Sequence, residues 1–386
     1  MTIQLDTLPP LSLYIHIPWC IKKCPYCDFN SHEYSESLPE DQYVSALLAD
    51  LENELPKIWG RRIRTIFIGG GTPSLFSADA IDRLITNIRS LLPVSPTAEI
   101  TLEANPGTVE QAHFYGYQQA GINRLSLGAQ SFHPAHLAAL GRIHTEKQIF
   151  AAIDTLKKAG INNFNIDLMF GLPNQTLAQA LADVKTAIEL AATHISYYHL
   201  TIEPNTAFYH SPPSIPDEDD AWEIHQAGKQ QLQHSGFIQY ETSAFAKPGK
   251  PCQHNVNYWS FGDYLGIGAG AHSKISDAHS QTITRYWKTK HPKAYLDGQT
   301  HQQFTAGQKT LSKQDIIIEF MMNALRLNAG FSLEQFQRTT GLAKSTVSAP
   351  LQSAIDAGFI TLDQTTGHVT PTTKGNNYLN SLLALF

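Results

Sequence analysis

Short apolar runs recur through the first half of the chain, and a longer amphipathic stretch follows most of them. The runs are rich in β-branched residues, which is typical of buried strands. The predicted strands are 11–17, 63–68, 98–103, 122–127, 163–169 and 195–200. The predicted helices are 39–55, 77–91, 109–120, 145–160 and 174–192. Strands that alternate with helices in this way imply an α/β fold with a parallel sheet, curled into a barrel or part of one.

The pattern changes after the sixth predicted strand. Residues 204–220 are rich in proline and acidic side chains and predict an exposed linker, and residues 237–245 alternate as one strand. Near the C-terminus, helical patterns over 312–326, 331–340 and 344–357 precede a small hairpin and a last helix. This order resembles a winged helix, a module that binds DNA or other proteins.

These changes predict three segments. The first is a barrel core over 1–205, and the second is a linker and barrel extension over 206–305. The third is a C-terminal helical, winged-helix-like domain over 306–386.

Charge and hydropathy narrow the class of protein. Lys and Arg number 28 against 34 Asp and Glu, so a basic nucleic-acid-binding face is not expected, and residues 344–386 carry few basic side chains. The C-terminal segment therefore favours protein docking over DNA binding. No stretch approaches the length of a transmembrane helix, and no secretory signal is visible at the N-terminus. We therefore expect a cytoplasmic protein, where clustered cysteines are metal ligands or catalytic groups rather than disulfides.

Three of the four cysteines lie in one short loop after the first predicted strand. Cys20, Cys24 and Cys27 have the spacing C-x3-C-x2-C. Three thiolates can hold three irons of a [4Fe–4S] cluster and leave the fourth iron open for a substrate or cofactor. The alternatives are a zinc site completed by His32, or a loop without a metal. The fourth cysteine, Cys252, is interpreted as a plain buried thiol, with a thiolate ligand or a covalent attachment point as the alternatives.

Aromatic residues surround the cysteines in sequence. Trp19, Tyr26 and Phe29 are expected to shield a cluster from water. The spacing, with an aromatic residue directly before the last cysteine, resembles the radical S-adenosylmethionine (SAM) superfamily. The resemblance implies a partial (βα)6 barrel, a [4Fe–4S] cluster and SAM bound to its open iron.

Polar residues stand where the predicted strands end, which is where barrel enzymes place their sites. The second strand runs into the glycines of "GGGTPSL", which let a ligand approach the backbone closely, although a plain tight turn is the simpler alternative. Glu103 can bind amine or hydroxyl groups, or else cap a helix. The other polar residues near strand ends are Gln130, Arg142 and Asp167.

The motifs "LYIHIPWC", "GGGTPS", "EANPGT", "GAQSF", "LGRIH" and "NIDLMFGLP" occur in the order seen in oxygen-independent coproporphyrinogen III oxidase and its relatives. This resemblance implies that Tyr14, Gly70 and Glu103 contact the cluster-bound SAM, with Gly71 in the same glycine segment. It also implies that an adenosyl-cofactor site, including that of a second SAM, is lined by Thr72, Gln130, Arg142 and Asp167.

The chain departs from the oxidase at two points. The oxidase has a further cysteine where this chain has Phe29, and it carries a longer segment before its first strand. Both differences indicate the sister group, the HemW-type heme chaperones. "CQHNVNYW" contains H-N-x-x-Y, which resembles the motif that this group uses for heme. His254 and Tyr258 are the candidate axial ligands, and Trp259 and Tyr264 offer flat surfaces to a porphyrin. A buried histidine and tyrosine with structural roles are the alternative.

The sequence therefore predicts a protein that binds heme and passes it to acceptor hemoproteins, with respiratory, membrane-associated acceptors among the candidates. The first alternative is an oxygen-independent coproporphyrinogen III oxidase. A different radical enzyme and a DNA-binding regulator are the others. Whether SAM is cleaved, whether heme is bound covalently and whether the chain forms a homodimer are left open.

Overall fold

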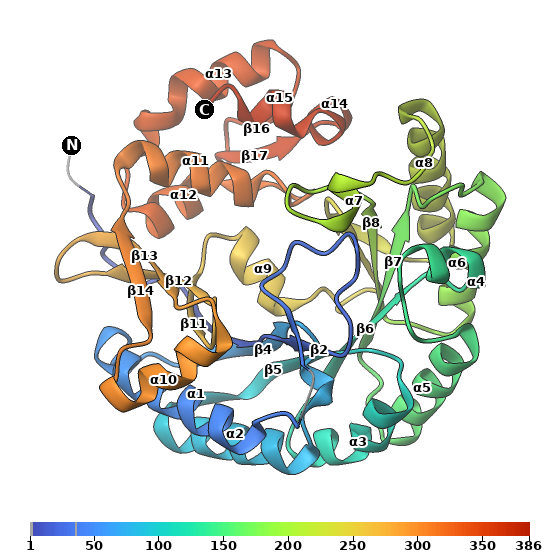
Figure 1. The fold of residues 1–386 in the computed structure, drawn as a ribbon. Helices are drawn as coiled ribbons and strands as arrows, with labels where there is room; N and C mark the ends of the chain where they lie inside the picture. Colours follow the sequence, from blue (N-terminus) through green and yellow to red (C-terminus); the bar gives the residue numbers. More distant parts are fainter. Residues whose placement is uncertain (1–2, 35–36) are drawn as a thin grey trace.

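The computed structural model describes residues 3–34 and 37–386, with no side-chain placement for 108–111. A curved parallel sheet forms its centre (Figure 1). Its strands follow the order β1-β4-β5-β6-β7-β8, and each pairs in parallel with the next. Their bounds are β1 Leu11–Ile17, β4 Ile63–Gly70, β5 Val94–Ala104, β6 Arg124–Gln130, β7 Phe164–Phe170 and β8 His194–His199. The predicted α/β partial barrel is confirmed.

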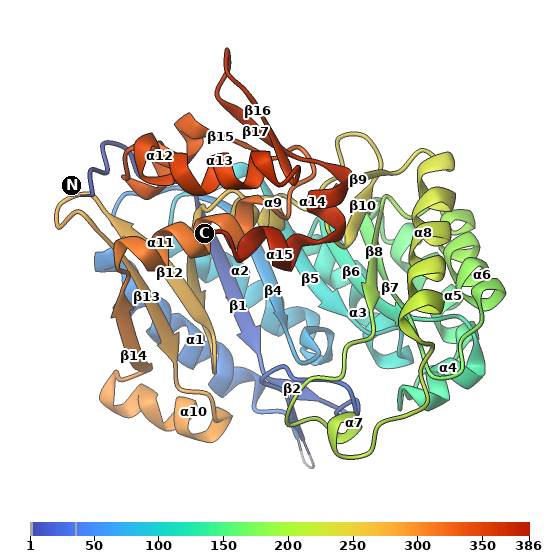
Figure 2. The same ribbon diagram turned by 90° about the horizontal axis from the view of Figure 1, so that it is seen from above.

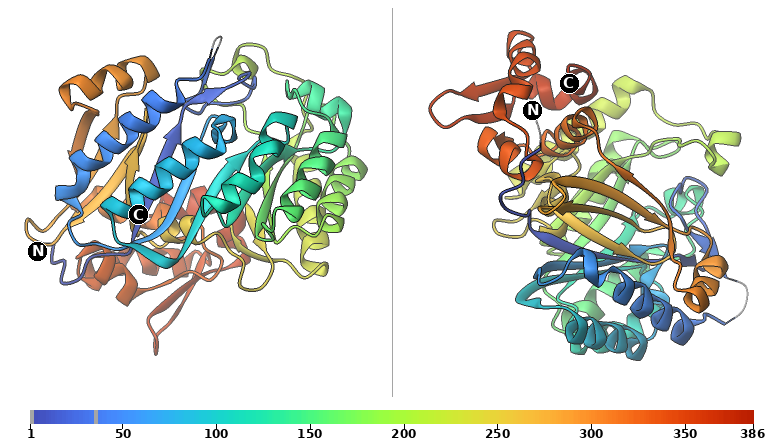
Figure 3. Two further views of the ribbon diagram at one scale, coloured as in Figure 1. Left: turned by 90° about the horizontal axis from the view of Figure 1, so that it is seen from below. Right: turned by 90° about the vertical axis from the view of Figure 1, so that its left-hand side faces the viewer.

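Helices cover the outer face of this sheet, as the left view of Figure 3 shows for α1 to α3. Their bounds are α1 Glu40–Glu54, α2 Ala78–Leu91, α3 Thr108–Gln119, α4 Pro134–Ala139, α5 Glu146–Lys158 and α6 Leu177–Glu189. Thr145 and Thr176 begin α5 and α6 as reciprocal capping boxes, which satisfy backbone N–H groups that a helix start leaves free. Short 3-10 turns lie at Leu55–Lys57 and Pro73–Leu75.

Further strands lengthen the sheet at both edges. At one edge β11 Asp263–Ile267 lies parallel to β1, and β12 His272–Asp277, β13 Thr282–Lys288 and β14 Thr305–Thr310 continue it as antiparallel strands. At the other edge β10 Ala244–Ala246 and β9 Ile238–Glu241 follow β8. The prediction of one strand over 237–245 is therefore wrong. A turn at Thr242 and Ser243 folds the segment into a hairpin, and the side chain of Glu241 accepts a hydrogen bond from the Ser243 N–H.

Two segments close the barrel region. Helix α9 Gln253–Trp259 lies inside the curve of the sheet, against β1, β4 and β11 (Figure 1). The linker predicted over 204–220 is exposed only in part. It contains the short helix α7 Ala207–His210, in which Phe208 is buried. The remaining elements here are β2 Trp19–Cys20, β3 His32–Glu33, α8 Glu218–His234 and α10 Pro292–His301.

The C-terminal unit has the helix and strand order of a winged helix. Its elements are α11 Lys313–Ala324, β15 Phe331–Ser332, α12 Leu333–Thr340, the 3-10 turn Lys344–Val347, α13 Ser348–Asp356, β16 Ile360–Asp363, β17 His368–Pro371, α14 Thr373–Asn377 and α15 Leu379–Leu383. The β16–β17 hairpin projects from the body (Figure 2). Phe320, Phe331 and Phe336 form part of an apolar core separate from that of the barrel.

The predicted division of the chain at residues 205 and 305 stays a prediction. Within the described residues, no helix has the length and apolar character needed to cross a membrane.

Candidate functional site

The cysteine loop leaves β1 and places three thiols near one another. Burial raises the pKa of Cys20, and the charges of Cys27 and Cys24 raise it further, so the three sulfurs share one local field. Cys27 Sγ lies 3.8 Å from Ser31 Oγ. If deprotonated, these half-buried sulfurs would repel one another, and an iron–sulfur cluster bound through them would supply the compensating positive charge.

The donor set fits a cluster better than a single ion. Among the described residues, no group of three or more His, Cys, Asp or Glu side chains is arranged to hold one metal ion. Thiolates that bind three different irons of a cubane need not converge on one point as the ligands of a single ion do, so the three cysteines remain compatible with a cluster. His32, the residue proposed to complete a zinc site, instead contacts Asn30 at 3.3 Å and the ring of His291.

A chain of hydrogen bonds joins two of the cysteines through residues from three strand ends. Thr72 Oγ1 donates to Cys20 Sγ over 3.5 Å and accepts from Asn105 Nδ2 at 3.0 Å. Arg142 Nη2 donates to Asn105 Oδ1 at 2.6 Å, and its Nη1 donates to Cys24 Sγ over 3.6 Å. Arg142 therefore places a cation beside the thiols, where it stabilises thiolate charge.

The glycine segment brings backbone against the cysteine loop. Gly70 has φ +124°, and a Cβ there would lie 2.7 Å from the Ile17 carbonyl oxygen. A Cβ on Gly71 would lie 3.0 Å from Cys20 Sγ. Any side chain at these positions would displace the first strand or the loop, so the glycines are required for the packing even before a ligand is considered.

Glu103 and Tyr14 occupy the wall beside these glycines. Glu103 Oε2 accepts from the Gly70 N–H at 3.0 Å. Burial and then the charge of Asp167 raise the pKa of Glu103 to about 8. The Tyr14 hydroxyl lies 2.9 Å from His16 Nδ1, while His16 Nε2 contacts the Asn30 carbonyl at 2.9 Å. The carbonyl requires a proton on Nε2, so Tyr14 donates to Nδ1.

The last two predicted cofactor residues lie on neighbouring strands. Asp167 accepts from Asn165 Nδ2 at 2.8 Å and Ser126 Oγ at 3.1 Å, and burial raises its pKa. Gln130 has φ +70° at a break in the β6–β7 register. The structure thus gathers the predicted SAM residues on the carboxyl edge of the sheet.

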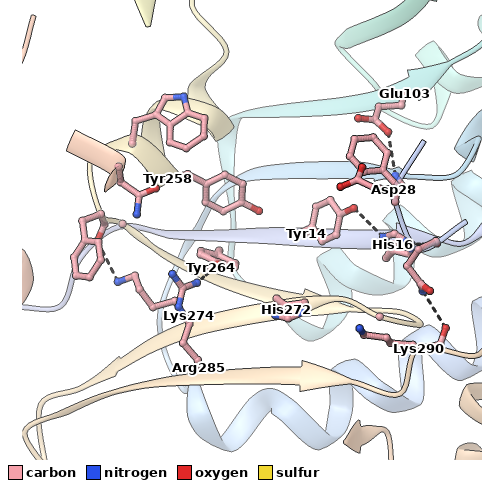
Figure 4. Close-up of a pocket in the computed structure, with 18 residues that line it drawn as sticks. Tyr14, His16, Asp28, Glu103, Tyr258, Tyr264, His272, Lys274, Arg285 and Lys290 are labelled. Carbon is pink, nitrogen blue, oxygen red and sulfur yellow. Dashed lines mark hydrogen bonds between the residues drawn. The ribbon is translucent and has the colours of Figure 1, made fainter. Parts of the chain in front are cut away.

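A cleft of about 680 Å³ opens beside this wall, a volume within the range of small-molecule sites (Figure 4). Tyr14, Gly70 and Glu103 line one part of it. Tyr258, Trp259 and Tyr264 line another, so three of the residues predicted for SAM and three of those predicted for heme face one cleft.

His254 itself is buried, with 1% of its surface exposed. Its Nδ1 lies 2.8 Å from Thr65 Oγ1, and its Nε2 lies 2.9 Å from the Tyr258 hydroxyl. Thr65 donates its own proton to Ser12 Oγ, so it accepts from Nδ1–H. Nε2 therefore carries a lone pair, to which Tyr258 donates. Burial and then the charge of Arg124 lower the pKa of His254 to about 3, which keeps the ring neutral.

The aromatic residues of the cysteine loop differ in role. Tyr26 is covered by Phe208, with ring centroids 6.4 Å apart. Trp19 packs into the core against Tyr43 and Phe76. Phe29 is 63% exposed and lines the cleft, so a shielding role for it stays a prediction. The loop turns outward there, and Lys23 Nζ donates to the Phe29 carbonyl at 3.2 Å.

Sequence reasoning missed several residues of the site. Asn105 was not singled out, although it stands two residues after Glu103 in the same strand-end segment. His272, Arg285 and Lys290 were not singled out either, because they come from β12, β13 and the residues just after β13, which only pairing with distant strands brings to the cleft. Cys252 is buried and lies 3.6 Å from Glu99 Oε1, and burial raises its pKa to about 11.

Comparison with known proteins adds two family matches. Residues 14–187 match the radical SAM superfamily, and residues 311–375 match the HemN C-terminal domain. Among solved structures, the coproporphyrinogen III oxidase HemN of Escherichia coli superposes with a TM-score of 0.82 at 24% identity, covering 98% of this chain and 90% of that one. This likeness shows the fold.

Curated relatives match over nearly the whole chain. The heme chaperone HemW of Haemophilus influenzae is 49% identical and covers 99% of each chain. Its counterpart in Escherichia coli is 48% identical over 98% of each chain. The Bacillus subtilis protein of the same name is 36% identical, over 86% of this chain and 87% of its own.

Proposed function

Since the chain belongs to the HemW family of the radical SAM superfamily, we propose that it binds heme and transfers it to acceptor hemoproteins. The observation that carries the proposal is that the H-N-x-x-Y helix and the cysteine loop open into one cleft. The family predicted from the sequence is confirmed. The acceptor stays a proposal, with membrane-associated respiratory hemoproteins as candidates, and so does a homodimer. Cysteines that bind a metal cluster must stay reduced, so we propose that the protein functions in the cytoplasm.

We propose Cys20, Cys24 and Cys27 as the ligands of a [4Fe–4S] cluster. When bound, such a cluster supplies an electron and an open iron for SAM. Thr72 and Arg142 donate hydrogen bonds to Cys20 and Cys24, and Asn105 bonds to both of these donors. For the SAM amino group and ribose we propose Gly70, Gly71, Glu103 and Tyr14, while Gln130 and Asp167 complete the adenosyl-cofactor wall.

For heme we propose His254 as the iron ligand and Tyr258 as the group that covers it. The tautomer assigned above leaves a lone pair on Nε2, the form that iron requires. In the structure, this lone pair accepts a hydrogen bond from the Tyr258 hydroxyl, which covers Nε2. Rotation of Tyr258 toward the cleft would free Nε2, and its return would favour heme release, as a carrier needs.

The test is heme titration of the anaerobically reconstituted chain. Wild type should bind about one heme per chain with a Soret band. His254→Gln should weaken binding and shift the band because amide groups are poor iron ligands. Tyr258→Phe should bind at least as tightly, since no hydroxyl needs to leave Nε2. His279→Gln, in an exposed turn, is the matched control and should match wild type.

The same sample should be assayed with coproporphyrinogen III. Decarboxylation by wild type, together with a heme spectrum that ignores His254→Gln, would assign the chain to the oxidase group instead. A Soret band lost in Tyr258→Phe but kept in His254→Gln would move the ligand to the tyrosine.

A further inference from the structure

Charge is unevenly distributed along the cleft. The acidic residues that line it are Asp28 and Glu103, from the cysteine loop and β5. The basic residues are Lys274, Arg285 and Lys290, which come from β12, β13 and the residues just after β13. Figure 4 shows Arg285, His272 and Lys290 spread along these strands, on the side away from Glu103. One wall of the cleft is therefore cationic.

Strand register forces two cations together. Lys274 on β12 pairs directly with Arg285 on β13, so both side chains project from the same face of the ladder. Like charges in such a pair are destabilising unless acids compensate them. Asp263 pairs with Lys274 at 2.8 Å, and Glu319 pairs with Arg285 at 2.6 Å. The fold thus contains two carboxylates that hold these cations in place, and Asp263 also pairs with Arg61 at 2.8 Å.

The ammonium group of Lys274 is buried and bound by other residues of the protein. Its side chain is 2% exposed, and Nζ also donates to the Phe261 carbonyl at 3.1 Å. It stands 4.1 Å from the centroid of the Phe261 ring. Lys274 therefore has a structural role and is not available to a ligand.

Arg285 keeps donors in reserve. Its side chain is 23% exposed. Nε and Nη2 donate to Glu319, and Nη1 donates to the Tyr264 hydroxyl. A guanidinium has five N–H donors, so three bonds leave two donors free within the described structure. Arg285 is held rigidly and still presents hydrogen-bond donors to the cleft.

Lys290 is fixed at its backbone and free at its tip. Asn30, from the cysteine loop, donates through Nδ2 to the Lys290 carbonyl at 2.9 Å. The side chain is exposed, and no carboxylate in the described part of the chain pairs with its ammonium. His272 lies between the two cations. Burial lowers its pKa, and the charges of Arg285 and Lys290 lower it further.

The neighbouring wall is aromatic, and the rings of Tyr258 and Tyr264 meet edge to face at an interplanar angle of 73°. Tyr258 and Tyr264 have ring centroids 4.4 Å apart, and the indole nitrogen of Trp259 is buried without a hydrogen-bond partner among the described residues. A ligand that suits the cleft therefore has an apolar plane at one end and anionic groups at the other.

We propose that Arg285 and Lys290, with His272 between them, bind the two carboxylates of a porphyrin whose ring lies against Tyr258 and Tyr264. This inference rests on the proposed function and adds an orientation to it. The propionate edge faces β12 and β13, and the iron faces α9. SAM also has a carboxylate, so the same cations have a second possible source of charge, which the experiment separates.

The experiment compares heme with heme dimethyl ester, which keeps the iron and the ring but has no carboxylate charge. Each charged hydrogen bond is worth about tenfold in affinity. Wild type should bind the ester about 100-fold more weakly than heme. Lys290→Gln should bind heme about tenfold more weakly and should reduce the ester penalty to about tenfold. Lys290 is exposed, so the variant should fold normally.

Two controls complete the design. Lys293→Gln, on the exposed surface of α10 and outside the cleft, should leave both affinities unchanged. Lys290→Glu should weaken heme more than Lys290→Gln does, because it repels a propionate, and should leave the ester affinity near that of Lys290→Gln. SAM titration of the same variants should give the wild-type affinity.

The outcomes distinguish the two proposals. Equal affinity of wild type for heme and its ester would overturn the carboxylate wall and leave the heme function standing. A chain that binds neither compound would overturn both. Loss of SAM affinity in Lys290→Gln with unchanged heme affinity would assign the wall to the methionine carboxylate and overturn the orientation proposed here.

Discussion

At the site, burial makes the ionised form of some single side chains costly. Glu103 is the clearest case, since its pKa rises to about 8 from an ordinary value of 4.5. The folded chain keeps this carboxyl protonated where the unfolded chain ionises it. Its contribution to stability is therefore fully present below about pH 4.5 and is lost as the pH rises through about 8. A group that costs stability at neutral pH indicates a functional reason for its presence.

Replacement by a neutral isostere tests this cost. Glu103→Gln never ionises and can still accept from the Gly70 N–H, so it should raise the free energy of unfolding at pH 7 by about 3 kcal/mol. The gain over wild type should shrink toward zero at pH 4.5 and grow toward pH 8, as measured by urea unfolding across that range. SAM affinity should fall in the same variant.

Glu189→Gln, on the exposed part of α6, is the matched control. This substitution removes one exposed carboxylate and should change the free energy of unfolding little at any pH between 4.5 and 8. A Glu103→Gln variant that is less stable than wild type at pH 7 would show that the folded chain holds this carboxylate ionised.

At the scale of elements, the cysteine loop depends on a segment distant in sequence. Helix α7 lies over it, and the Phe208 N–H donates to the Pro25 carbonyl at 2.9 Å. The Phe208 ring joins a small apolar cluster with Leu140, Leu172 and Tyr26. The loop itself has few buried apolar side chains, so this cover limits access of water and oxygen to the thiols.

Removal of the cover should expose a bound cluster. Phe208→Ala should cost about 3 kcal/mol of local stability and make the visible absorbance of the reconstituted protein decay several-fold faster in air. Its neighbour Tyr209 is 54% exposed, so Tyr209→Ala should decay at the wild-type rate. Equal decay of both variants would show that α7 does not protect the cluster.

At the scale of the whole molecule, the C-terminal unit contributes to the cleft. Asn323 of α11 lines it, and Arg326 stacks over Trp259 with its guanidinium carbon 4.4 Å from the ring centroid. Arg326 also pairs with the buried Glu241 at 3.2 Å, which ties the unit to the β9–β10 edge. Arg326 thus links the C-terminal unit to helix α9 and to the β9 edge of the sheet.

Loss of this arginine should loosen the unit. Arg326→Met keeps much of the apolar contact with Trp259 but leaves the Glu241 carboxyl buried without its cation, at a cost of about 2 kcal/mol. Limited proteolysis should then cut faster between the barrel and α11. Arg338→Met on the exposed side of α12 should resist cleavage as wild type does. Unchanged cleavage of Arg326→Met would place the attachment in the apolar contacts alone.

The sequence by itself determined the repeating strands and helices, the cysteine loop and the family. These depend on short-range patterns. Strand periodicity, helix capping and the C-x3-C-x2-C spacing are each contained within a few consecutive residues. The parallel strand order could also be predicted, because short helical connections between strands permit few sheet topologies. Errors fell on segments whose structure depends on distant partners, namely the strand expected at 237–245 and the linker at 204–220.

Only the tertiary structure decided how the cleft is formed. Strand β11 pairs with β1, although nearly the whole barrel separates them in sequence, and this pairing brings Tyr264, Arg285 and Lys290 opposite Glu103. The closure of His254 by Tyr258 and Thr65 likewise needed α9 to enter the barrel. No local pattern encodes these contacts, because each arises where two elements meet and its energy depends on burial and charge contributed by both.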